Sequence, residues 1–125
     1  MQKTIFRLIT MLLIVQYSGP IRAQDQAEGK KLYATYCASC HGENGKGDGP
    51  ASQAFSVKPG DHTNGAIMNK DSDEFLSEII SKGGAAVGKS TFMPAWGNTL
   101  NEKQVSAVIA YIRSIAVPPY KSAEK

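Results

Sequence analysis

Apolar positions recur with helical spacing in three segments of the chain, at about residues 25–40, 72–82 and 100–116. Each segment therefore predicts an amphipathic helix with one buried face. The expected face of the first helix comprises Gly29, Tyr33, Tyr36 and Cys40. That of the second comprises Phe75, Leu76, Ile79 and Ile80, and that of the third comprises Val105, Val108, Ile109, Ile112 and Ala116.

Polar residues, glycine and proline mark the ends of the second and third helices. Gly83 is suited to end the second helix, because glycine readily takes the left-handed conformation found there. Pro118 cannot continue the third helix. Two N-terminal capping pairs are expected, Asp71 with Glu74 and Thr99 with Glu102.

Glycine-rich loops separate the helices, at residues 42–49, 58–65 and 83–97. No segment predicts a strand, so the expected fold class is all-α. Loops of this length usually wrap around a bound group or a functional site. A large apolar cofactor would supply the core that three helices alone lack.

The first 23 residues have the layout of a secretory signal peptide. Lys3 and Arg7 precede an almost unbroken apolar run at residues 8–15, and Ala23 is a small residue suited to the position before a cut. A membrane-spanning helix needs about 20 apolar residues, so an uncleaved anchor is the weaker alternative. We expect export to the periplasm, an oxidising compartment.

Residues 24–125 are long enough for one domain. Its helical core is expected at about residues 27–116, followed by a short tail at 117–125. The net charge of +3 comes from the leader, because three of the 14 basic residues lie there and the rest of the chain carries 11 basic and 11 acidic residues. The charge therefore indicates no nucleic-acid-binding surface.

Cys37, Cys40 and His41 form the pattern C-x-x-C-H, which is typical of covalent haem attachment. Two thiols one helical turn apart can each add to a vinyl group on one edge of a porphyrin, and the adjacent histidine is then held beside the iron. A redox dithiol, a zinc site that also uses His62, and a structural disulfide are the alternatives. A redox dithiol usually lies in a βαβ unit, which this chain does not predict.

From residue 27 to residue 116 the chain resembles the small single-haem class I cytochromes c. The resemblance rests on four motifs, C-A-S-C-H at 37–41, G-D-G-P at 47–50, F-M-P-A-W-G at 92–97 and V-I-A-Y-I-R at 108–113. It implies a cytochrome c-like fold, in which three main helices and long loops wrap around one covalently bound haem c with its iron.

The resemblance also implies roles for individual residues. Met93 lies where class I cytochromes place the second axial ligand, opposite His41. Met68 and His62 are the alternatives, and we expect His62 to be a solvated loop residue. Pro50 resembles the proline whose carbonyl accepts a hydrogen bond from the axial histidine.

Three further residues match family positions at which the first and last helices cross. Gly29 would permit close approach, with Tyr33 and Tyr111 packed around it. Trp96 would cover the haem, donate to a propionate or simply pack in the core.

With both axial positions filled, the implied function is one-electron transfer between respiratory or dehydrogenase partners, without substrate turnover. A haem-based ligand-binding or sensor module with a weak sixth ligand is the alternative, and a dithiol oxidoreductase is a third. Redox proteins are the expected partners, and peripheral contact with membrane complexes stays open. Five lysines could form a patch that steers an acidic partner, namely Lys46, Lys58, Lys70, Lys82 and Lys89.

Residues 83–90 also satisfy G-x-x-x-x-G-K-[ST], the pattern of a nucleotide-binding loop. That loop needs a buried strand before it and a long helix after it. Here a helix precedes the pattern and Pro94 prevents a helix after it, so we expect no nucleotide binding.

Overall fold

The computed structural model describes residues 21–121, which are helical apart from loops and one isolated bridge between Asn64 and Val117. The all-α prediction is therefore confirmed. The longer helices are α1 (Ile21–Tyr36), α4 (Asp73–Lys82) and α5 (Glu102–Ile115). The short ones are α2 (Ala38–His41), α3 (Gly65–Met68) and two 3₁₀ helices, η1 (Pro50–Ala54) and η2 (Gly84–Val87).

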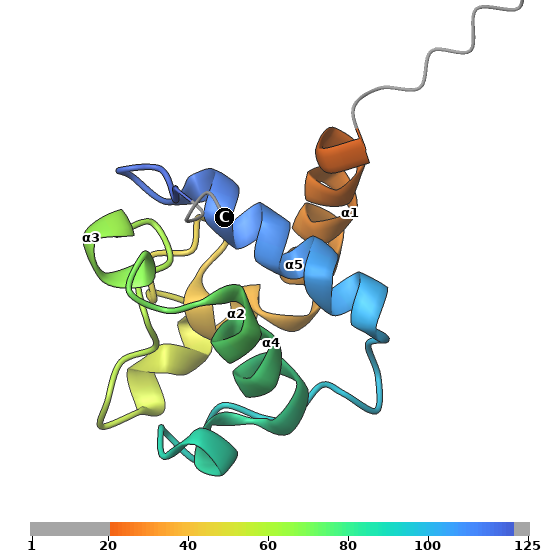
Figure 1. Ribbon diagram of the computed structural model, residues 1–125. Coiled ribbons are helices and arrows are strands. Elements are labelled where there is room, and N and C mark those ends of the chain that lie inside the picture. The colour runs from red at the N-terminus through yellow and green to blue at the C-terminus, as the bar shows by residue number, and fades with distance from the viewer. Residues whose placement is uncertain (1–20, 122–125) are drawn as a thin grey trace, which may run out of the picture.

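The two terminal helices, α1 and α5, cross each other and form the largest interface of the fold (Figure 1). A Cβ atom at Gly29 would overlap the carbonyl oxygen of Ala107, so glycine is what allows the helices to come this close. The rings of Tyr33 and Tyr111 meet edge to face beside this point, with centroids 5.1 Å apart. The expected crossing is confirmed.

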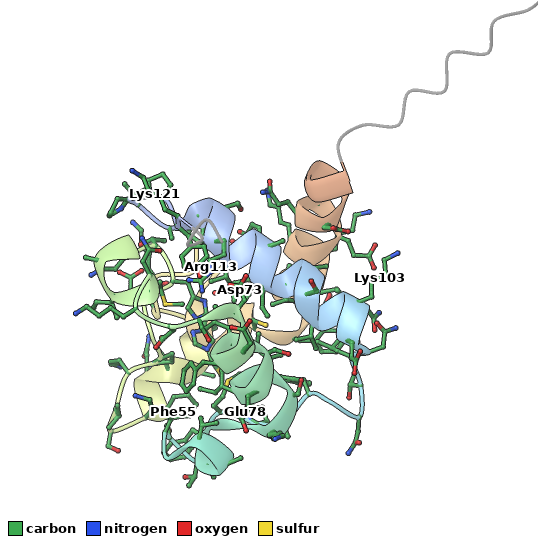
Figure 2. All side chains as sticks on the ribbon, viewed as in Figure 1. Phe55, Asp73, Glu78, Lys103, Arg113 and Lys121 are labelled. Carbon is green, nitrogen blue, oxygen red and sulfur yellow. The ribbon has the colours of Figure 1, made fainter. Side chains whose placement is uncertain are left out.

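Helix α4 packs beside α5 and completes the frame. Leu76 and Ile80 are buried, and all five residues expected on the inner face of α5 are buried as well. The buried guanidinium of Arg113 in α5 donates to Asp73 of α4 at 2.9 Å and to the Met68 carbonyl at 2.8 Å. Figure 2 shows Arg113 and Asp73 lying side by side. These bonds join α5 to the segment that leads into α4.

Both predicted capping pairs are wrong by one or two positions. The cap of α4 is Ser72, whose hydroxyl accepts from the Phe75 N–H at 3.1 Å. In α5, Asn101 and Gln104 bond each other's backbone N–H groups. Several neighbouring polar residues are suitable caps by type, so the sequence pattern located each cap only to within two positions.

The first predicted helix is divided in two. Cys37 has a φ of −114°, away from the helical value of about −63°, and it separates α1 from α2. Gly83 ends α4 with a φ of 85°, as predicted. Residues 1–20 of the expected signal peptide lie outside the described residues, and α1 runs on through Ala23, so a cut after Ala23 stays a prediction.

Among residues 21–121, none of the helices combines the length and the apolar character needed to cross a bilayer.

Candidate functional site

The C-x-x-C-H residues form a tight turn directly after α1. The backbone N–H groups of Cys40 and His41 both donate to the Cys37 carbonyl, at 3.2 Å and 2.9 Å. Cys37 is buried, Cys40 is half-buried, and both are free thiols in the structure. The turn therefore presents two thiols and one imidazole within a single helical turn.

Burial, with a further contribution from Cys40, raises the pKa of the Cys37 thiol to about 12. A redox-active dithiol needs a thiol whose pKa is lowered, because the thiolate is the attacking form. The surroundings of Cys37 instead raise the pKa of its thiol, which disfavours the thiolate. This is evidence against Cys37 as the attacking thiol of a dithiol oxidoreductase.

The loop after the motif folds back onto it through backbone hydrogen bonds. The N–H of Gly47 donates to the His41 carbonyl at 2.7 Å, and the N–H of Gly49 donates to the Cys40 carbonyl at 3.1 Å. Gly47 has a φ of 75°, a conformation that few residues other than glycine adopt. The loop thus holds the motif in one conformation and brings residues 58–65 alongside it.

The imidazole of His41 is held at its edge by one hydrogen bond. Its Nδ1–H donates to the Gly60 carbonyl at 3.1 Å. Since a carbonyl can only accept, the neutral ring carries its lone pair on Nε2, the nitrogen that remains able to bind a metal. Burial lowers the pKa of His41 and so favours this neutral form.

The expectation for Pro50 is wrong in one respect, because Gly60 and not Pro50 supplies the carbonyl that His41 uses. Pro50 begins η1 instead, where its fixed φ suits the first position of a helix. The physical reason is the path of the loop at 58–65, which passes close beside Gly47 and so brings the Gly60 carbonyl to His41. Contact between Pro50 and a cofactor stays a prediction.

The expectation that His62 is a solvated loop residue is also wrong. Its Nδ1 and the Tyr33 hydroxyl lie 2.9 Å apart in a hydrogen bond, and its ring stacks on that of His41 with centroids 4.2 Å apart. Burial is the largest cause that lowers the pKa of His62 to about 3, and the neighbouring His41 adds to it. His62 is therefore neutral near pH 7.

The two remaining methionine candidates lie in different surroundings. Met68 is 5% exposed and belongs to the hydrophobic core. Met93 is half-buried in the loop between η2 and α5, where its carbonyl accepts from the Gly84 N–H at 3.0 Å. Trp96 from the same loop packs against Tyr36, with ring centroids 5.1 Å apart. Of these two methionines, Met93 is the one that lies on a loop, and its backbone is held by the hydrogen bond to Gly84.

The zinc and nucleotide patterns lack the structural context that they require. In the part of the chain that the structure describes, no three His, Cys, Asp or Glu side chains lie close enough together to hold a metal ion. Residues 83–90 follow α4 rather than a strand, and they contain the 3₁₀ helix η2. A hydrogen bond from the Lys89 N–H to the Gly84 carbonyl, at 2.8 Å, closes this turn. The donor set at 37–41 instead fits a porphyrin, which brings its own nitrogen ligands.

The chain matches the Cytochrome c family over residues 26–116. It belongs to that family. Its haem is therefore haem c, covalently bound with its iron, and its helical frame is the cytochrome c fold that the sequence predicted.

Relatives of this cytochrome c family member include a protein of similar length and a much longer one. Cytochrome c6 of Synechococcus sp. is 30% identical over 109 residues, which cover 87% of this chain and 87% of that protein. The cbb3-type cytochrome c oxidase subunit FixP of Bradyrhizobium diazoefficiens is 33% identical over 95 residues, which cover 75% of this chain. These residues make up only 29% of FixP, so the chain spans less than a third of that relative.

Among solved structures, the chain is similar to part of the reducing HAO-like protein complex of Kuenenia stuttgartiensis. The TM-score is 0.58 at 30% identity, over 78% of this chain and 47% of that one.

Sequence reasoning on this cytochrome c family member missed two functional contacts, the Gly60 carbonyl and the His62 ring. Both belong to a loop that follows the C-x-x-C-H motif by about twenty residues. No local motif marks them. The only indication in the sequence was the length of the polar loop at 58–65, because a long loop in a compact domain has to pack against other residues or a cofactor.

Proposed function

We propose that this chain is an exported one-electron carrier whose haem is held by Cys37, Cys40, His41 and Met93, with Pro50 in contact with it. Cys37 and Cys40 would hold the haem through two thioether bonds, each formed when the S–H group adds across one vinyl group and its hydrogen passes to the other vinyl carbon. His41 and Met93 would ligate the iron. The observation that carries the proposal is the His41 ring, held by Gly60 so that Nε2 is free to ligate, directly after two free thiols.

The residues of the site then have separate tasks. Bound haem supplies a one-electron couple at its iron. The two cysteines would fix its position, and the bond from His41 to Gly60 would raise the basicity of the His41 imidazole as a ligand. A thioether ligand from Met93 would favour the reduced state and so raise the reduction potential.

Occupation of both axial positions favours electron transfer over ligand binding, because no site on the iron is then left for a substrate or gas. The test is carbon monoxide binding to the reduced protein. We expect the wild type to bind it slowly or not at all, and Met93→Ala to bind it rapidly because that variant opens one axial position. Rapid binding by the wild type would support the sensor alternative instead.

We infer that the partners are redox proteins. The name of FixP, a subunit of a cytochrome c oxidase, supports partners of this kind. Of the five lysines considered as a docking patch, Lys58 donates to the Ser52 carbonyl at 2.9 Å and Lys82 pairs with Glu78 at 3.0 Å. A patch would therefore depend on the exposed Lys46, Lys70 and Lys89. If it steers an acidic partner, electron-transfer rates fall as salt rises.

Export to the periplasm rests on the leader at residues 1–23. The proposal expects the purified mature protein to start at Gln24, which mass spectrometry of its N-terminal peptide would show. A mature chain that starts before Gln16 would contradict it.

A further inference from the structure

His62 lies against the face of His41, with ring centroids 4.2 Å apart and ring planes 18° from parallel. At this separation the two rings are in direct contact. The His41 imidazole therefore cannot turn about its bond to Cβ without displacing the ring of His62.

His62 is itself held in place from two directions. Its backbone N–H donates to the Gly45 carbonyl at 2.7 Å, and its Nδ1 shares a hydrogen bond of 2.9 Å with the Tyr33 hydroxyl. Tyr33 is 1% exposed and lies in the crossing of α1 and α5, against Tyr111. The position of the His62 ring is thus tied to the crossing of α1 and α5, the largest helix interface of the fold.

The same loop also supplies the carbonyl that holds the edge of His41. Asp61, which lies between Gly60 and His62, accepts from the backbone N–H and the hydroxyl of Thr63 at 2.9 Å and 2.6 Å. These two bonds brace the turn. One braced turn therefore holds His41 by its edge, through Gly60, and by its face, through His62.

We propose that His62, anchored by Tyr33, is a positioning residue that sets the orientation of the His41 imidazole plane when that ring binds the iron. This inference rests on the proposed function, in which His41 is an axial ligand. The plane of an axial imidazole determines how the unpaired electron of ferric haem is distributed over the macrocycle. Second-shell contacts of this kind orient metal ligands and tune the metal.

The test compares variants of the haem-loaded protein by the proton NMR shifts of the ferric haem methyl groups and by the ferric electron paramagnetic resonance spectrum. His62→Leu removes the stacked ring and is expected to change the spread of the methyl shifts and the g-values. His62→Phe keeps a flat ring without the bond to Tyr33 and should lie nearer the wild type. Tyr33→Phe keeps the His62 ring but frees it, and should give a smaller change of the same kind.

Val108→Ala is the control, because Val108 is fully buried in α5, none of the ring contacts or hydrogen bonds described above uses its side chain, and its truncation loosens the core. We expect it to lower the melting temperature and to leave both spectra unchanged. If His62→Leu leaves the spectra unchanged, or if Val108→Ala changes them equally, His62 has only a structural role and the proposal is overturned. If His62→Leu does not fold, Tyr33→Phe decides the question: changed spectra support the proposal, and spectra identical to the wild type overturn it.

Failure of the proposed function has a different signature. In that case the wild-type ferric protein itself lacks the spectrum of histidine ligation, and the proposal for His62 falls with it. A normal wild-type spectrum with insensitive His62 and Tyr33 variants overturns the positioning role alone.

Discussion

One hydrogen bond, from His41 Nδ1 to the Gly60 carbonyl at 3.1 Å, determines which nitrogen of His41 can bind a metal. Two methionines, the buried Met68 and the half-buried Met93, differ just as clearly in their surroundings. Met68 lies within α3 and the core, whereas Met93 lies on a loop whose backbone is bonded to Gly84. At the scale of the residue, the surroundings of His41 and of the two methionines, and not the residue type alone, determine which atoms are available to a metal.

Met93→Ala should abolish the weak far-red absorption band of the ferric protein, because that band needs sulfur bound to iron. Met68→Leu is the matched control. It should keep the band and cost less than about 1.5 kcal/mol of unfolding free energy, since the two side chains have similar volumes. Visible spectra of the two oxidised variants check this, and a band that persists in Met93→Ala rules out Met93 as the ligand.

The candidate ligands could be predicted because their evidence is local. Cys37, Cys40 and His41 are adjacent in the chain, and Met93 lies in a short motif at an expected place. The contacts of His41 could not be predicted in the same way. They depend on how the loop at 58–65 closes over Gly45 and Gly47, which is a property of the tertiary structure.

At the scale of the element, periodicity predicted the three main helices well because their buried faces are regular. Helix ends were predicted less well. Thr99 and Asn101 are both suitable caps by type, and each has Glu or Gln three residues later, so the pattern did not distinguish them; in the structure Asn101 is the cap.

Asn101→Ala should destabilise the protein by about 0.5–2 kcal/mol, because it leaves the Gln104 N–H without its acceptor. Thr99→Ala changes an exposed residue outside the helix and should stay within about 0.5 kcal/mol of the wild type. Denaturant unfolding of both variants measures the difference. Equal losses would mean that α5 does not start where the structure places it.

Gly29→Leu should destabilise the crossing of α1 and α5 by about 1–3 kcal/mol, since any side chain there meets the Ala107 carbonyl. Each kcal/mol lowers the melting temperature by roughly 4–8 °C in a domain of this size. Ala27→Leu places the same leucine side chain at an exposed position of α1 and is the control. A melting curve for Gly29→Leu that matches the wild type would contradict the crossing.

At the scale of the whole molecule, a helical frame carries long loops that approach the C-x-x-C-H turn. The frame of α1, α4 and α5 packs its own apolar core, and the loops between them contain η1, α3 and η2. The need for a cofactor was predictable from the ratio of loops to helices. The short helices could not be predicted from the sequence, because a helix of four or five residues is too short to show a hydrophobic period.

The most direct test of the account is the intact mass of the purified protein after denaturation and acid–acetone extraction, which removes haem that is not covalently bound. The account predicts a coloured polypeptide heavier than its sequence by one haem, in which neither Cys37 nor Cys40 reacts with an alkylating reagent. A colourless polypeptide from cells competent in haem maturation, with both cysteines alkylated, would contradict it.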